Sequence, residues 1–146
     1  MDPWIEAAKT KMQEIVNDVH AKHPNTIVEV ALVGYRDYGD LVRFRVYDFG
    51  SAPDLEDRMG DLRAEGGDDT AEDIAGAFKR ATELSWDPAD IRMVFHITDA
   101  PAHGLQFHPI HLSDRFPRGD PEESMADLLS PAVSRAVTQR ISSQGR

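Results

Sequence analysis

The chain has 146 residues, no cysteine and a formal net charge of −10 at neutral pH. This length suits one domain of the commonest size, and the lack of cysteine excludes disulfides and thiol catalysis and favours a reducing compartment. The acidic balance argues against nucleic acids and anionic membranes as partners, because both require a basic face. The sequence has no signal peptide and no apolar run of the roughly 20 residues that a transmembrane helix needs. It therefore predicts a cytoplasmic protein.

The first third of the chain predicts a helix followed by a β-hairpin. Asp2 and Pro3 form a helix-start pair, after which apolar residues recur at helical spacing up to about Ala21. Residues 27–35 are nearly all apolar and predict an interior strand. A short turn containing glycine leads to residues 42–47, where apolar and polar side chains alternate as in a half-exposed strand. We expect an antiparallel hairpin with the alternating strand at the edge of the sheet.

Two helices are predicted in the middle of the chain. Residues 53–64 carry apolar side chains on one side of a short helix. The next helix opens on two overlapping capping pairs, Asp69 with Glu72 and Thr70 with Asp73. Its apolar stripe runs on from there towards residue 86.

Residues 91–98 form an apolar, β-branched run that predicts a strand buried on both faces. Asp99 follows at its carboxyl end, the position where open α/β sheets bind ligands. Alternatively, Asp99 only caps its own turn. Residues 101–121 predict a long loop of the kind that is usually functional or mobile, and residues 122–141 predict a C-terminal helical segment.

Three segments carry a resemblance to a known family: Ala-Leu-Val-Gly-Tyr-Arg-Asp-Tyr at 31–38, Gly-Gly-Asp-Asp-Thr-Ala-Glu-Asp-Ile at 66–74, and Ile-Thr-Asp-Ala-Pro-Ala-His-Gly at 97–104. Their order resembles the von Willebrand factor A domain, in the variety found beside alpha-kinases and in related bacterial proteins. The likeness covers about residues 2–120. It implies an α/β fold, a three-layer sandwich with helices on both faces of a small sheet, and residues 1–146 would form one truncated domain of this type.

In that family, partners bind through a metal-ion-dependent adhesion site built from three motifs. Thr70 matches the second motif and Asp99 the third. The first motif, Asp-x-Ser-x-Ser, is missing here together with the strand that precedes it. Mg²⁺ requires an octahedron of oxygen ligands, and these two side chains supply too few. We therefore expect no cofactor, with Mg²⁺ bound only if the missing motif is supplied. A helix N-cap is the alternative role for Thr70.

The residues of the long loop suggest an alternative kind of site. His103, His108 and His111, with Asp114, could form a transition-metal site, since imidazole suits Zn²⁺ and its neighbours; their spacing fits no standard zinc pattern. The sequence shows neither a nucleophile elbow nor a phosphate-binding glycine loop. We therefore expect a non-catalytic protein-interaction module. The alternatives are a metal-dependent enzyme or metal-binding protein that uses this loop, or a fragment whose true start lies upstream.

The missing strand also affects the sheet. In the family it lies between the strands that correspond to residues 27–35 and 91–98. An unfilled gap would leave buried backbone groups unpaired, at a cost of about 1–3 kcal/mol each. Either these two strands pair directly, in parallel, or another chain donates a strand to the gap. We expect direct pairing, in a three-stranded sheet. Residues 91–98 would then form an open apolar edge, which we expect a homodimer to protect. The sequence does not identify any other protein partner.

Overall fold

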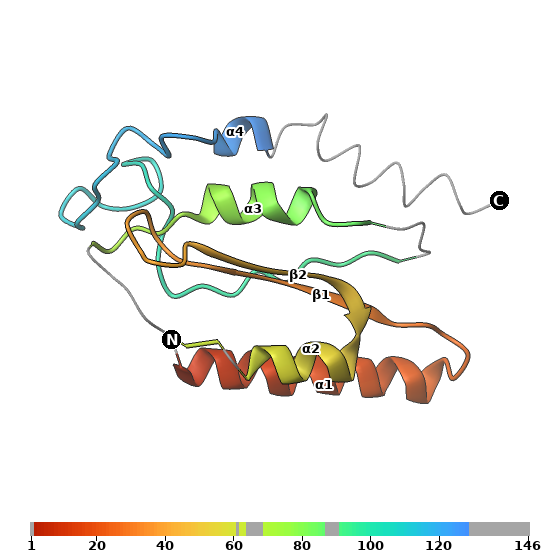
Figure 1. The fold of residues 1–146 in the computed structure, drawn as a ribbon. Helices are drawn as coiled ribbons and strands as arrows, with labels where there is room; N and C mark the ends of the chain where they lie inside the picture. The colour runs from red at the N-terminus through yellow and green to blue at the C-terminus, as the bar shows by residue number, and fades with distance from the viewer. Residues whose placement is uncertain (1, 61, 64–68, 87–90, 129–146) are drawn as a thin grey trace.

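The computed structural model describes residues 2–60, 62–63, 69–86 and 91–128. These residues form a small mixed α/β domain with a two-stranded antiparallel sheet. No helix among them is long and apolar enough to cross a membrane. In chain order (Figure 1) the elements are α1 (Asp2–Lys22), β1 (Glu29–Tyr35), β2 (Phe44–Ser51), α2 (Ala52–Met59), α3 (Ile74–Thr82) and α4 (Met125–Leu128).

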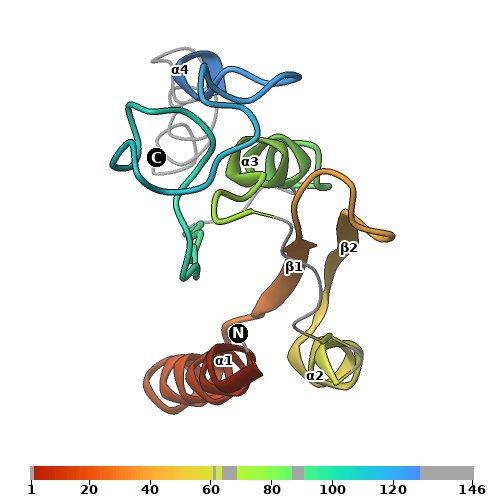
Figure 2. The same cartoon turned by 90° about the vertical axis from the view of Figure 1, so that its left-hand side faces the viewer.

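The helices lie on both faces of the sheet. α1 and α2 pack side by side on one face, and α3 lies on the other face with α4 beyond it (Figures 1 and 2). Buried apolar side chains mark both contacts. Val16 of α1 is 6% exposed and Leu55 of α2 is 4% exposed on the first face, while Ile74 of α3 is 6% exposed on the second. The apolar faces that the sequence assigns to these helices are therefore the faces that pack.

The predicted hairpin is confirmed. β1 and β2 pair antiparallel, with Tyr35 opposite Phe44 beside the turn and Glu29 opposite Ser51 at the far end. β2 begins two residues later than predicted and continues to Ser51. Val46, expected on the covered face of the strand, is 44% exposed. The strict alternation predicted from the sequence therefore does not match the observed burial of β2. The pairing register also shifts between Val30 and Leu32.

α2 follows β2 without a linker. The Ser51 side chain accepts a hydrogen bond from the backbone N–H of Asp54, and Pro53 occupies the first turn of the helix. The helix ends at Met59, before the predicted end at residue 64, which lies outside the described residues. The pattern gave the position of this helix correctly and overestimated its length.

α3 begins later than predicted. Its N-cap is Asp73, whose carboxylate accepts from the backbone N–H of Gly76, so the expected N-cap role of Thr70 is wrong. The reason is tertiary hydrogen bonding. The N–H of Thr70 donates to the carbonyl of Ser113, and that of Glu72 donates to the carbonyl of Pro101. These bonds hold residues 70–72 against the long loop, where the sequence predicts the first helical turn.

Residues 91–98 differ most from expectation. No backbone hydrogen bond joins this segment to β1, and no part of it forms a strand, so the strand buried on both faces and its direct pairing with β1 are both wrong. Its apolar side chains are exposed, with Ile91 at 75% and Phe95 at 62%. The segment lies on the side of β1 away from β2 (Figure 2). A side-chain contact links the two, with the Tyr35 hydroxyl 3.0 Å from His96 Nε2. A β-branched run becomes a strand only when another backbone can pair with it, and β1 does not supply that backbone here.

The segment 101–121 is irregular, as predicted, and its turns are held by backbone bonds such as Leu105 N–H to the carbonyl of Pro117. Of the predicted C-terminal helical segment 122–141, α4 falls within the described residues. The part from 129 onward lies outside them.

Candidate functional site

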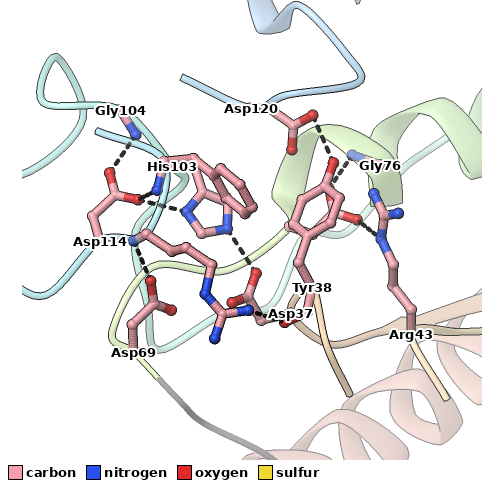
Figure 3. Close-up of polar contacts among 12 residues, drawn as sticks. Asp37, Tyr38, Arg43, Asp69, Gly76, His103, Gly104, Asp114 and Asp120 are labelled. Atoms are coloured by element: carbon pink, nitrogen blue, oxygen red, sulfur yellow. Dashed lines mark hydrogen bonds and ion pairs between the residues drawn. The ribbon is translucent and has the colours of Figure 1, made fainter. Parts of the chain in front are cut away.

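Polar side chains from three segments converge at one end of the sheet (Figure 3). Asp37 follows the carboxyl end of β1, Asp69 precedes α3, and His103 and Asp114 belong to the long loop. His103 lies at the centre and is 2% exposed. The site is therefore assembled from residues up to 77 positions apart, counted from Asp37 to Asp114.

His103 bridges two carboxylates. Its Nε2 lies 2.6 Å from Asp37 Oδ1 and its Nδ1 lies 2.7 Å from Asp114 Oδ1. An ionised carboxylate can only accept hydrogen bonds, so ionised Asp114 requires a proton on Nδ1. Burial raises the pKa of Asp37; when Asp37 is ionised too, Nε2 also carries a proton and the ring is an imidazolium. Burial opposes that charge, but the hydrogen bonds to Asp114 and Asp37 outweigh it and raise the pKa of His103.

The carboxylate of Asp114 accepts four hydrogen bonds within the loop. Its Oδ1 accepts from the Phe116 N–H as well as from His103, and its Oδ2 accepts from the Gly104 N–H and from His108 Nε2. Burial alone would favour the neutral acid, yet these four donors hold the pKa of Asp114 well below its usual range. Gly104 has a φ of +114°, a conformation that favours glycine. One carboxylate thus fixes both ends of the loop 103–116.

A second cluster ties the hairpin to α3. Asp73 is fully buried, and its Oδ2 accepts from Arg43 Nε at 2.6 Å. The Arg43 guanidinium lies 3.6 Å from the centre of the Tyr38 ring, and the Tyr38 hydroxyl donates to Asp120 at 2.8 Å. Burial raises the pKa of Asp73 to about 6, against the opposing effect of Arg43. These contacts hold the hairpin against α3, while Asp120 Oδ2 is buried without a hydrogen-bond partner among the described residues.

Next to His103, several carboxylates lie close together. We call the group Asp37, Asp40, Asp69, Glu72 and Asp99 the acidic corner. Burial, and then the negative charges of Asp37, Asp40, Asp99 and Asp69, raise the pKa of Glu72 to about 7. Asp37, Asp69 and Glu72 each have one buried carboxylate oxygen without a hydrogen-bond partner among the described residues. Buried acceptors in native proteins normally have partners, so the acidic corner is suited to a group that brings positive charge and hydrogen-bond donors.

The residues predicted from the family's adhesion site lie around this corner. Asp99 is exposed and close enough to Glu72 to raise its pKa. Thr70 is also exposed. The buried oxygens without partners belong to other residues, so Thr70 and Asp99 by themselves do not form a cage of the kind that Mg²⁺ requires.

The predicted histidine site is only partly assembled. His103 and His108 both contact Asp114, whereas His111 is exposed and outside the network. Asp69, His103 and Asp114 place one possible ligand atom each within 4.8 Å of one another. However, both His103 nitrogens are already hydrogen-bonded, as described above, and Asp69 accepts from the Arg115 N–H. The geometry favours an internal network that holds the loop in place over an open metal site.

The sequence analysis did not identify the roles of Asp37, Asp69 and Glu72. Asp37 follows the carboxyl end of β1, as Asp99 follows residues 91–98. The rule that singled out Asp99 would have singled out Asp37 too. Asp69 and Glu72 were assigned to helix capping. Nothing in the sequence indicates that hydrogen bonds to the long loop keep these residues outside the helix.

The chain is similar to the alpha-protein kinase vwkA of Dictyostelium discoideum, with 32% identity over 138 residues that make up 92% of this chain. It spans 22% of the length of that relative. No family model matches the chain, and no solved structure matches it.

Proposed function

We propose that the chain is a non-catalytic, cytoplasmic protein-interaction module of von Willebrand factor A type with an incomplete adhesion site. The observation that carries this proposal is the exposed apolar segment 91–98. Met93 is 58% exposed, Val94 57% and Ile97 40%, in addition to Ile91 and Phe95. Contiguous apolar surface of this kind marks protein interaction sites.

Two further observations support the family part of the proposal. Helices on both faces of a small sheet fit a truncated version of the family's three-layer sandwich. The similarity to an alpha-protein kinase fits the resemblance to the variety found beside alpha-kinases. Kinase activity is not part of the proposal, because the chain spans 22% of that relative.

We further propose that the module forms a homodimer in which the segments 91–98 of two copies cover each other. Light scattering coupled to size exclusion tests this with the Phe95→Glu variant, and the matched control is Ile110→Glu. Both positions are exposed, at 62% and 83%, so neither change disturbs a core. The wild type and Ile110→Glu should run as dimers and Phe95→Glu as a monomer. A wild type that is monomeric at tens of micromolar would contradict the homodimer.

A further inference from the structure

We infer that residues 69–73 are a two-state segment, which the long loop holds in a non-helical path in this structure and which forms an additional first turn of α3 when the loop is released. The inference goes beyond the proposed function and does not depend on the homodimer. Four features of the structure and sequence lead to it: the bonds to the loop, the backbone of Asp73, the capping residues, and the position of Glu72.

The long loop holds the segment through backbone bonds. The N–H of Thr70 donates to the carbonyl of Ser113, and the N–H of Glu72 donates to the carbonyl of Pro101. Glu72 also forms a single parallel bridge with Ala102. These contacts come from two parts of the loop that are far apart in sequence. The non-helical path of the segment therefore depends on the loop being docked.

Asp73 is the residue at which the observed path and a longer helix diverge. Its φ of −74° already suits an α-helix, whereas its ψ of 63° does not. Because the N–H of Ile74 donates to the carbonyl of Glu72, Asp73 is the central residue of an inverse γ-turn. A rotation of ψ by roughly 105° brings Asp73 to the helical value of about −42°. At this residue, the change requires one backbone angle only.

The sequence of the segment favours the helical arrangement. Thr70 and Asp73 have the spacing of a capping pair, but in the structure Asp73 caps α3 through the N–H of Gly76. The Thr70 hydroxyl makes no hydrogen bond to another described residue. In a helix that begins after Thr70, this hydroxyl caps the first turn, and the carboxylate of Asp73 lies near the amino end, where negative charge is favourable.

Glu72 opposes the observed arrangement. Its carboxylate lies among the other members of the acidic corner, and one of its oxygens is buried without a hydrogen-bond partner in the part of the chain that the structure describes. Burial of a charged or polar group without a partner is unfavourable. The bonds to the loop must outweigh this cost, so release of the loop removes what holds Glu72 in place.

The contacts that keep the loop docked converge on Asp114. Its carboxylate accepts four hydrogen bonds, and His103 connects it to Asp37 at the end of β1 (Figure 3). Loss of this anchor frees the neighbouring carbonyl of Ser113, which holds Thr70. Asp114 therefore sets the balance between the two arrangements, although it lies outside the segment that changes. Such an exchange of one set of contacts for another is a conformational switch.

Nuclear magnetic resonance of the full chain, with EDTA present, tests the switch in the Asp114→Asn variant. Amides in the loop 103–116 should exchange at least about tenfold faster than in the wild type, and the carbon chemical shifts of residues 70–73 should become helical. His108→Gln removes one donor to Asp114 and should shift both observables in the same direction by less. It decides the question alone if Asp114→Asn does not fold. The matched control is His111→Gln, at an exposed position outside the network, and it should change neither observable.

Thr70→Val distinguishes the switch from simple loosening of the loop. It keeps the N–H that donates to Ser113 and removes only the hydroxyl that would cap the additional turn. Alone, it should leave the shifts of residues 70–73 unchanged. Combined with Asp114→Asn or His108→Gln, it should remove the helical shifts while the loop stays released. A released loop with non-helical shifts at 70–73, a loop that stays protected in the anchor variants, or helical shifts that survive Thr70→Val would each overturn the inference.

Discussion

His103 anchors the long loop through charge, because its contacts on both sides are carboxylates. A buried ion pair of this kind adds little stability compared with apolar packing, but it is costly to break from one side, since the remaining charge stays buried. The network therefore specifies one position for the loop relative to β1. It also couples that position to the protonation of a single ring.

The His103→Gln variant should show this coupling. The folded-state pKa of His103 is raised above its ordinary value of 6.5, so its contribution to stability is fully present below pH 6.5 and is lost as the pH rises through the raised value. Removing one member of a buried ionic group costs about 3–5 kcal/mol. Urea unfolding of the wild type should therefore show a decline above pH 7 that the variant lacks. If the free energy of unfolding of the variant declines above pH 7 as steeply as that of the wild type, a group other than His103 causes the decline.

Glu72 also makes the stability of the domain depend on pH, over a lower pH range than His103 does. Its pKa rises from 4.5 to about 7 on folding. Stability from this group is present below pH 4.5 and falls as the pH rises towards 7. The Glu72→Gln variant should be more stable than the wild type at pH 8. One pKa unit corresponds to about 1.4 kcal/mol, so the gain is at most about 3.5 kcal/mol and less after solvent screening of this half-buried group. Equal unfolding midpoints of the variant and the wild type at pH 8 would mean that folding does not raise the pKa of Glu72.

At the scale of elements, the first turn of α3 is tightly packed at Gly76. A Cβ on Gly76 would lie 2.3 Å and 2.6 Å from the Asp73 carboxylate oxygens and 2.6 Å from the Phe44 ring. Asp73 cannot move aside, because Arg43 holds it. The junction thus depends on the absence of a side chain at one position.

Gly76→Ala should therefore destabilise the domain by about 1–3 kcal/mol, the usual cost of overpacking, although alanine is the better helix former. Gly50→Ala is the matched control, because a Cβ there meets nothing within 4 Å. Thermal unfolding of the two variants should separate them clearly. If the two variants unfold at the same temperature, the carboxylate of Asp73 has room to shift.

The elements that the sequence predicts well are those whose signals are local. α1 shows helical spacing over its whole length, and the hairpin has two apolar runs joined by a glycine turn. The start of α3 and the segment 91–98 depend on distant partners. The carbonyls of Pro101 and Ser113 decide the first, and the second depends on β1, which forms no backbone hydrogen bond with it. The same limit applies to the site. Asp99 and Asp114 were singled out by residue type and position, but the meeting of His103 with Asp37 is a property of the fold.

At the scale of the whole molecule, one prediction concerns divalent cations. We predict that Mg²⁺ and Mn²⁺ bind weakly or not at all at Thr70 and Asp99, because two exposed side chains provide too few oxygen ligands. Isothermal calorimetry of the wild type and Asp99→Ala measures this. Micromolar affinity that disappears in the variant would contradict the prediction.

Ser51 is both the last residue of β2 and the N-cap of α2. The strand and the helix therefore share a residue, and no slack separates them. Any change in the twist of the hairpin must turn α2 with it, and α1 packs against α2. The orientation of the helical layer α1–α2 is thus set by the end of the hairpin where Ser51 lies opposite Glu29.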